Sequence, residues 1–386
     1  MGHDAAPVSA LLPTYAPYPF AVVRGLGDRL WDEQGNEYLD LYGGHCVCAT
    51  GHAHPRLVAA LAEQAAALPF YSMAARVPVR ERAAAALCAF AGMGSVFLCN
   101  SGAEANESAL KLAAQLTGRQ RFVAFRGGFH GRTLLALSAT DDPKLHAGLE
   151  PLLAPVDLLP FGEMTPLATH DWTQVAAVIV EPVQSMAGVR TASAAWFECL
   201  REVTAKAGTL LIFDEVQTGM GRLGAPFAAQ RYGVMPDLMT AAKGIASGVP
   251  MGALLLDAAL ARRVAPGMLG STFGGSPLAA AALLATLGVI HDEGLMARAR
   301  AVAERLRREL HGSVVRKVRG EGLLLGLDCG PHAAALKAEL LAARILVGGS
   351  GDPAVLRLMP PLTVSDASLE WFVSAVRGFS RGAVAA

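Results

Sequence analysis

Short apolar runs alternate with longer amphipathic stretches through the middle of the chain. Short apolar runs bounded by polar or turn-forming residues predict buried strands, and apolar residues three and four positions apart predict helices. Helical spacing occurs at 57–68 and 80–90. The apolar runs that follow occupy 96–99, 122–125, 175–180, 210–213, 238–242 and 252–256. Strands that alternate with helices in this way indicate an α/β fold around a mostly parallel sheet buried on both faces.

The pattern differs toward the two ends of the chain. Residues 21–42 alternate apolar and polar positions around turn-forming glycines, which predicts a short antiparallel meander. After Pro277 we expect helices and strands of a smaller α+β unit, at 278–290, 295–310, 323–327, 355–358 and 368–379. We therefore divide the chain into an N-terminal segment (1–55), a large domain (56–276) and a C-terminal segment (277–386).

The composition of the chain argues against several classes of function. Lys plus Arg and Asp plus Glu both number 33, so no net field would attract nucleic acid or an acidic membrane. The hydrophobic share of 53% is high for a soluble domain, which favours an oligomer with a buried subunit contact.

The apolar tract at 278–290 is too short to cross a bilayer of roughly 30 Å. The N-terminal MGHDAAPVSALLPTY lacks a basic region before a long apolar core, so we expect no secretory signal and a cytoplasmic location.

The stretch GGHCVCATGHAHP gathers potential metal ligands, namely His45, Cys46, Cys48, His52 and His54. Zinc modules usually place paired cysteines in two separated pairs, and this spacing does not match them. We favour a Gly-rich loop with a helix that begins after Pro55, and we predict no metal site. The six cysteines are scattered and indicate no disulfide framework.

Distinctive polar groups follow several of the predicted strands. Ligands bind beyond the carboxyl ends of the strands in open α/β sheets, so these groups are candidate site residues. They are Asn100 to Gly102, the segment from Gly127 to Arg132, Glu181, Asp214 and Lys243.

The segment after Asn100 predicts a capped helix. Ser101 and Glu104 have capping-box spacing, and Gly118 is the expected C-cap. An ordinary capped helix explains this pattern. The alternative is an anion site, because Gly102 and Ala103 leave the free N–H groups of the helix start open to a phosphate.

Lys243 and Asp214 also have two interpretations each. Lys243 lies within an apolar stretch and is either a lysine whose head reaches the surface or an amine of lowered pKa that forms a Schiff base. Asp214 is either a helix cap or ion-pair member, or the acid that keeps a cofactor nitrogen protonated. A phosphate cradle, a lysine and an acid together match the needs of pyridoxal phosphate.

With these residues in place, the sequence resembles the class III (ω-amino acid) aminotransferases of pyridoxal phosphate fold type I. The resemblance runs from about Tyr15 to Leu362. It rests on NSGAEANESALKLA (100–113), GGFHGRTLLALSAT (127–140), VEPVQ (180–184), LIFDEVQTGMGRLG (211–224), AAKGIASGVPMGA (241–253), GSTFGGSPLAAAA (270–282) and LRLMPPL (356–362). It implies a large domain with a mostly parallel sheet and a smaller α+β domain formed by the N- and C-terminal segments.

The resemblance also implies roles for individual residues. Lys243 would bind pyridoxal phosphate and then move the proton, and Asp214 would pair with the pyridine nitrogen. The remaining cofactor residues would be Ser101, Gly102 and Ala103 at the phosphate, Phe129 and Val216 on the two ring faces, and Gln217 near the ring oxygen. Thr272 would reach the phosphate of a neighbouring subunit, implying a homodimer with shared sites. Arg132, Arg357 and Glu181 would bind substrate.

The implied reaction transfers the terminal amino group of N-acetylornithine, or a similar N-acyl diamine, to 2-oxoglutarate. Alternatives are another amine donor, such as ornithine, 4-aminobutyrate or a specialised-metabolism amine, or a racemase or mutase on the same fold. One position departs from the family pattern: EPVQSMAG has Met186 where related enzymes have a glutamate that pairs with the arginine matching Arg357. We expect Met186 either to change the donor pocket or to be a neutral loop substitution.

Overall fold

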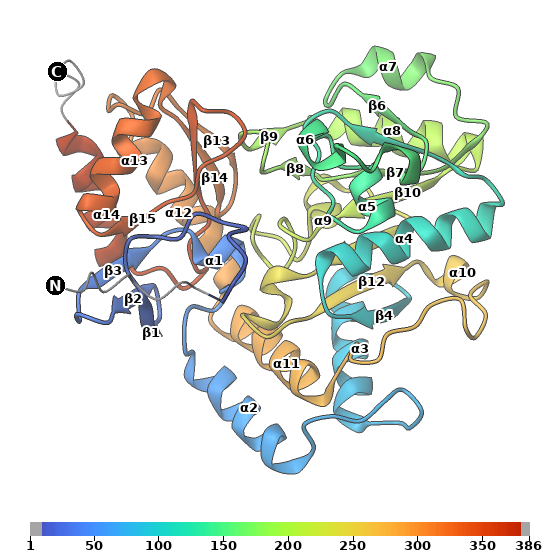
Figure 1. Ribbon diagram of the computed structural model, residues 1–386, viewed down its shortest axis with the longest axis horizontal. Helices are drawn as coiled ribbons and strands as arrows, with labels where there is room; N and C mark the ends of the chain where they lie inside the picture. Colours follow the sequence, from blue (N-terminus) through green and yellow to red (C-terminus); the bar gives the residue numbers. More distant parts are fainter. Residues whose placement is uncertain (1–9, 380–386) are drawn as a thin grey trace, which may run out of the picture.

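The computed structural model describes residues 10–379. The N-terminal residues 1–9, which begin the stretch used above to argue against a secretory signal, lie outside this range. Two units form the molecule (Figure 1), and the larger one contains a seven-stranded sheet in the order β4-β12-β11-β10-β7-β5-β6. Its strands are β4 (Ser95–Cys99), β5 (Arg121–Phe125), β6 (Val156–Leu159), β7 (Val175–Val180), β10 (Leu210–Asp214), β11 (Leu238–Ala241) and β12 (Gly252–Leu256).

The sheet is mostly parallel, as the sequence predicted. Strand β10 pairs in parallel with β7 and β11, and β5 pairs in parallel with β6 and β7. Strand β12 is antiparallel to both of its neighbours, so β4 runs in the same direction as β11. The carboxyl ends of β4, β5, β7, β10 and β11 therefore meet at one edge.

Both faces of this sheet are buried. Phe122, Ile179 and Ile212 pack with helix α4 (Gly102–Thr117) on one side. Val123 and Phe213, which point to the opposite face, join the main core that includes helices α3 (Pro78–Ala91) and α8 (Ala194–Ala207). This alternation explains why these strands are apolar at every position rather than at every second one.

Both ends of the chain contribute to the smaller unit, on the left of Figure 1. The predicted meander is present as β1 (Val22–Leu26), β2 (Arg29–Asp32) and β3 (Glu37–Asp40), and β15 (Ile345–Leu346) joins it in parallel beside β3. A second sheet consists of β13 (Lys317–Glu321), β14 (Leu324–Asp328) and β16 (Val355–Leu358). The exact domain boundaries at 55/56 and 276/277 stay predictions.

Five of the longer helices lie close to their predicted ranges. They are α2 (Pro55–Ala67), α3, α11 (Pro277–Asp292), α12 (Leu295–Glu309) and α14 (Asp366–Gly378). Shorter elements are α1 (Gly43–Cys46), α5 (Leu134–Ser138), α6 (Pro143–His146), η1 (Glu150–Leu152), α7 (Met164–Thr169), β8 (Val183–Gln184), β9 (Arg190–Thr191), α9 (Ala228–Tyr232), η2 (Lys243–Ala246), α10 (Ala258–Ala261), η3 (Gly330–His332) and α13 (Ala333–Ala342). Within residues 10–379 no single helix has the length and apolarity of a membrane span, and α11 and α12 pass that test only as a pair bent by 61°.

Candidate active site

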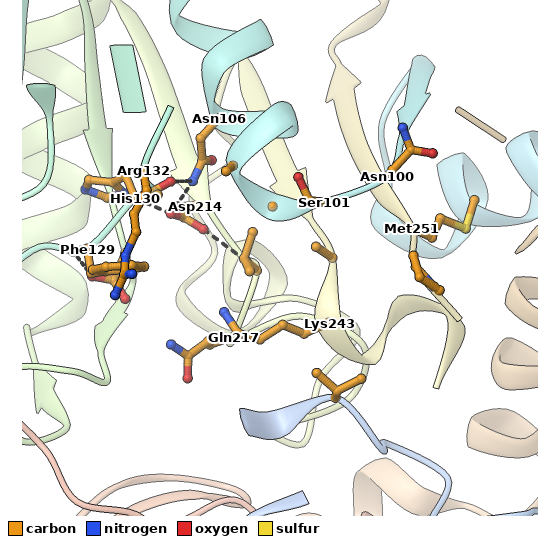
Figure 2. A pocket seen from close by; sticks show the side chains of 18 of the residues that line it. Asn100, Ser101, Asn106, Phe129, His130, Arg132, Asp214, Gln217, Lys243 and Met251 are labelled. Atoms are coloured by element: carbon orange, nitrogen blue, oxygen red, sulfur yellow. Dashed lines mark hydrogen bonds and ion pairs between the residues drawn. The ribbon is translucent and has the colours of Figure 1, made fainter. Parts of the chain in front are cut away.

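A cavity of about 510 Å³ opens at the sheet edge where the parallel strands end. This volume is within the range of about 300–1,000 Å³ that is usual for cofactor and small-molecule sites. Most of the predicted site residues line it: Ser101, Gly102, Ala103, Phe129, Arg132, Glu181, Asp214, Val216, Gln217 and Lys243. The polar groups that follow the strand ends therefore lie around one cavity, and their roles stay predictions (Figure 2).

Two predicted residues do not line the cavity. Thr272 is exposed in the loop before α11, and its role at a neighbouring subunit's site stays a prediction. Arg357 on β16 is buried, with 4% of its surface exposed. Its Nη1 donates a hydrogen bond to Ser185 Oγ at 3.0 Å.

Asp214 is held by a buried hydrogen-bond network (Figure 2). Its Oδ2 accepts from Asn106 Nδ2 at 2.7 Å and lies 2.8 Å from His130 Nδ1, while Oδ1 accepts from the Val216 N–H at 3.1 Å. Asn106 Oδ1 in turn accepts from Thr240 Oγ1 at 2.6 Å. The network leaves the carboxylate fixed at the mouth of β10, aimed at the cavity.

Sequence reasoning missed Asn106, and it included His130 only as part of the candidate segment 127–132, without a link to Asp214. Each is at most 2% exposed, and each is a polar group that would be costly to bury without a partner. Asn106 could have been noticed because it interrupts the apolar face of its helix, between Ala105 and Ala109. Nothing in the local pattern connects either residue to Asp214, since 108 and 84 positions separate them from it.

Lys243 is the first residue of η2, directly after β11. Its φ of +47° lies in the left-handed region, which is uncommon for a residue with a side chain and is often found at functional sites. Burial lowers the pKa of the Lys243 ammonium, against the opposing charge of Asp214. A larger fraction of neutral amine follows, and the neutral amine is the nucleophilic form.

The start of α4 is the candidate anion cradle. Ser101 caps the helix by accepting from the Glu104 N–H at 3.1 Å, and Gly118 ends it in the left-handed region, both as predicted. The Glu104 carboxylate reaches the backbone N–H of Asn100 rather than that of Ser101. A Cβ on Gly102 would lie 2.9 Å from Val216 Cγ1, so only glycine fits beside that side chain.

Phe129 and Glu181 form one wall of the cavity. Glu181 Oε1 accepts from the backbone N–H of Phe129 at 2.8 Å and so orients the residue whose ring faces the opening. Burial raises the pKa of Glu181 to about 7, with the charge of His130 opposing the shift and that of Asp214 adding to it. This carboxyl group can therefore be neutral or charged near neutral pH.

The GGHCVCATGHAHP stretch lies beside the site as the short, irregular α1 followed by a loop. Gly43, Gly44, His45 and Cys46 all have positive φ, and Cys46 Sγ lies 3.9 Å from the Gln217 carbonyl. Helix α2 begins at Pro55, as predicted. In the part of the chain that the structure describes, no three His, Cys, Asp or Glu side chains are grouped to hold a metal ion.

The fold and the cavity together define a pyridoxal phosphate type of site. An amine, an acid and a helix start without bulky side chains face one opening, and these are the three groups that the cofactor requires. The residues present thus fit the aldehyde, the ring nitrogen and the phosphate of the cofactor.

Comparisons with known proteins agree with this class. The family profile "Aminotransferase class-III" matches residues 12–378. The chain is 44% identical to the acetylornithine aminotransferase of Streptomyces coelicolor, covering 95% of this chain and 92% of that protein. It is 42% identical to the acetylornithine aminotransferase of Methanopyrus kandleri, covering 92% of this chain and 93% of that protein.

Solved structures give the same result. The ornithine aminotransferase of Toxoplasma gondii superposes with a TM-score of 0.89 at 31% identity, covering 95% of this chain and 91% of the other. The acetylornithine aminotransferase of Elizabethkingia anophelis superposes with a TM-score of 0.83 at 30% identity, covering 95% of this chain and 96% of the other. The chain belongs to the class III aminotransferase family, and it is a pyridoxal phosphate-dependent transaminase.

Proposed function

We propose that this enzyme transfers the terminal amino group of N-acetylornithine, or of a similar N-acyl diamine, to 2-oxoglutarate. The observation that carries the proposal is the whole-chain similarity to acetylornithine aminotransferases, at 37–44% identity over at least 92% of the chain. The products would be a semialdehyde and glutamate. A cytoplasmic location stays a prediction.

The cofactor, when bound, would supply an aldehyde that condenses with amines and a ring that withdraws electrons. We assign the amine partner of that aldehyde to Lys243, which would also move the proton during transfer. Asp214 would keep the ring nitrogen protonated, since Asn106 and His130 fix its carboxylate. Ser101, Gly102 and Ala103 would bind the phosphate through the start of α4.

The remaining predicted residues complete the proposed site. Phe129 and Val216 would lie on the two ring faces, and Gln217 near the ring oxygen. Arg132 lines the cavity and would bind a substrate carboxylate in the bidentate fashion typical of guanidinium. Glu181 would contact incoming substrate, and its raised pKa would let it do so without a fixed charge.

Ornithine is a second candidate donor. The similarity in structure to the Toxoplasma gondii ornithine aminotransferase supports it, although the sequence identity of 31% is lower than to the acetylornithine enzymes. Steady-state rates with N-acetylornithine, ornithine and 4-aminobutyrate, each with 2-oxoglutarate, test the proposal. A higher kcat/KM for N-acetylornithine is expected. Turnover that persists without any 2-oxo acid would instead indicate a racemase or mutase.

We further propose a homodimer with shared active sites. Phe273, beside Thr272, is 63% exposed and contacts Phe70, which is 39% exposed, with ring centroids 5.2 Å apart. Tyr71 and Met73 extend this apolar surface, at 49% and 65% exposed. Contiguous exposed apolar side chains of this kind mark interaction surfaces. A second copy placed here would bring Thr272 to its neighbour's phosphate site.

A further inference from the structure

Arg80 in α3 is a buried cation that ties two surface loops together. It is 5% exposed, and its guanidinium donates to four backbone carbonyls. Nε donates to Gly275 at 2.7 Å and Nη2 to Tyr71 at 2.5 Å, while Nη1 donates to Ser72 and Ala75 at 3.3 and 3.4 Å. These bonds use most of the N–H donors of the guanidinium, so Arg80 is suited to holding backbone rather than to binding an anion.

The two loops that Arg80 joins carry the proposed dimer surface. One loop comprises residues 68–77, between α2 and α3, and the other is the segment 270–276 before α11. The rings of Phe70 and Phe273 connect the same two loops at the surface. The loops are therefore joined twice, by exposed rings and by a buried guanidinium.

Ser271 fixes the loop 270–276 on the side before Thr272. Its Oγ accepts hydrogen bonds from Asn100 Nδ2 and from the Gly274 N–H, each at 3.1 Å. Asn100 follows β4 and lines the active-site cavity (Figure 2). At this point the loop is therefore attached to the cavity wall of its own subunit.

Close packing fixes the same loop after Thr272. A Cβ on Gly275 would lie 2.6 Å from Leu98 Cδ1, and a Cβ on Gly274 would overlap the Leu98 carbonyl oxygen. Gly275 also has a φ of +64°, in the left-handed region that favours glycine. Arg80 bonds the carbonyl of this residue, so it holds the loop where the loop packs on β4. Thr272 is exposed between the two fixed points.

We propose that Arg80 is a positioning residue for the active site of the neighbouring subunit. It holds the loop 270–276 so that Thr272 reaches the phosphate end of the neighbour's cavity, and its effect therefore appears in the partner's site and not in its own. A guanidinium suits this task because its planar fork bonds several carbonyls at once, which a lysine ammonium does not reproduce. This inference rests on the proposed homodimer and names the residue that fits each subunit to its partner's site.

Two hybrid dimers, purified through separately tagged subunits, distinguish the two sites. Both combine Arg80→Lys with Lys243→Ala, which leaves a subunit unable to hold the cofactor through its lysine. In the first hybrid one subunit carries both substitutions, so the lysine-bound site of the other subunit receives Thr272 from the altered loop. In the second hybrid the substitutions lie in different subunits, so the lysine-bound site receives Thr272 from a loop in which Arg80 is intact.

The visible band of the lysine-bound cofactor reports the affinity of this single site during cofactor titration. The dissociation constant should rise at least about tenfold in the first hybrid, the equivalent of one lost hydrogen bond to a charged group. In the second hybrid it should stay within about twofold of a dimer that carries Lys243→Ala alone in one subunit, the usual limit for sites that act independently. Arg80→Gln should give the same order of the two hybrids, because it also removes the fork.

Arg119→Lys is the matched control. Arg119 also donates to backbone carbonyls, those of Val175, Ala207 and Gly208, but near the amino ends of β7 and β10. In place of Arg80→Lys, it should leave the cofactor affinity of both hybrids unchanged.

Equal dissociation constants in the two hybrids, whether both are raised or both unchanged, would overturn the proposal, as would a weaker site in the second hybrid. A monomeric parent would overturn this proposal and the proposed homodimer together. The expected order of the hybrids in an enzyme that does not accept N-acetylornithine would contradict only the proposed donor.

Discussion

At the scale of single residues, Asp214 explains why a carboxylate follows a buried apolar strand. Asn106 and His130 hold its Oδ2 at 2.7 and 2.8 Å, which fixes the group without exposing it to water. Such a fixed acid can stabilise a positive charge on a ring nitrogen throughout the reaction. The same carboxylate would otherwise be an expensive group to bury.

Asp214→Ala should retain cofactor and lose turnover. Without the carboxylate the ring is a poor electron sink, so kcat should fall by about 10²–10³, the usual cost of removing one electrostatic contact to developing charge. The cofactor's visible band on the purified variant reports retention, and steady-state rates report kcat. Near-normal turnover would contradict the role assigned to Asp214.

Individual site residues differ in how well the sequence predicts them. Lys243 and Asp214 could be predicted because each follows a recognisable apolar run. Gly102 could be predicted because small residues begin a capped helix there. Asn106 and Ser185 could not be predicted, and His130 could not be linked to Asp214, because their partners lie far away in the sequence and are brought close only by the folded sheet and the β8–β9 hairpin. Local patterns report burial, whereas contacts between distant segments depend on the topology.

At the scale of elements, the anion cradle depends on close backbone packing. A Cβ on Gly252 would lie 2.3 Å from the Ser101 carbonyl, so β12 and the start of α4 approach one another only through glycine. Gly252→Ala should displace Ser101 and weaken cofactor binding at least tenfold, with a loss of about 1–3 kcal/mol in stability from overpacking. Cofactor titration and thermal denaturation measure the two effects.

Gly378→Ala provides the comparison for that substitution. Among the described residues, no atom outside its chain neighbours and its own helix backbone lies within 4 Å of a Cβ built on Gly378, and its φ is not in the left-handed region. It should therefore leave both stability and cofactor affinity close to those of the parent. If Gly252→Ala behaved like Gly378→Ala, the cradle would not depend on this approach.

His52 links the loop before α2 to strand β3. Its Nε2 lies 2.8 Å from Asp40 Oδ2. Burial alone would lower the pKa of His52, but hydrogen bonds to Asp40 and Cys48 outweigh it and raise the pKa to about 10. Because the folded pKa exceeds the ordinary value of 6.5, this pair stabilises the fold below pH 6.5 and loses that effect as pH rises toward 10.

His52→Gln should remove that pH dependence. At pH 6 the variant should be less stable by about 1–3 kcal/mol, the range for hydrogen bonds to charged groups. The difference from the parent should shrink as pH rises toward 10, because the parent loses its charged histidine. Thermal denaturation at pH 6, 8 and 9.5 checks this. A difference that is constant across these pH values would show that His52 is neutral in the folded protein.

The central strands of the large sheet, which are almost completely buried, were predicted well, whereas two partly buried edge strands were missed. The central strand β7 is apolar throughout and β10 is apolar up to its last residue, Asp214, and both were found within one residue of their bounds. Strands β6 and β13 were missed because they are only partly buried, so polar residues such as Asp157 and Arg319 interrupt the apolar pattern. Their pairing partners, rather than their own composition, make them strands.

At the scale of the whole molecule, the central question is how two copies would meet. Phe273→Asp should shift the protein toward monomer, because it places a charge in the proposed apolar contact. It should also weaken cofactor binding, since Thr272 would no longer reach the neighbouring site. Sedimentation velocity with cofactor titration measures both effects.

Leu152→Asp is the control for that variant. Leu152 in η1 is 62% exposed, close to the value for Phe273, and lies outside the proposed contact. It should leave the oligomeric state and cofactor affinity unchanged. Equal behaviour of the two variants would argue against this surface as the dimer contact.

The most direct test of the proposed function is the visible absorption spectrum of the holoenzyme during addition of N-acetylornithine, with no 2-oxo acid present. We predict that the band of the lysine-bound cofactor disappears and that the band of the amine form replaces it. Later addition of 2-oxoglutarate should restore the first spectrum. A cofactor band that does not respond to N-acetylornithine would contradict the assignment of the donor.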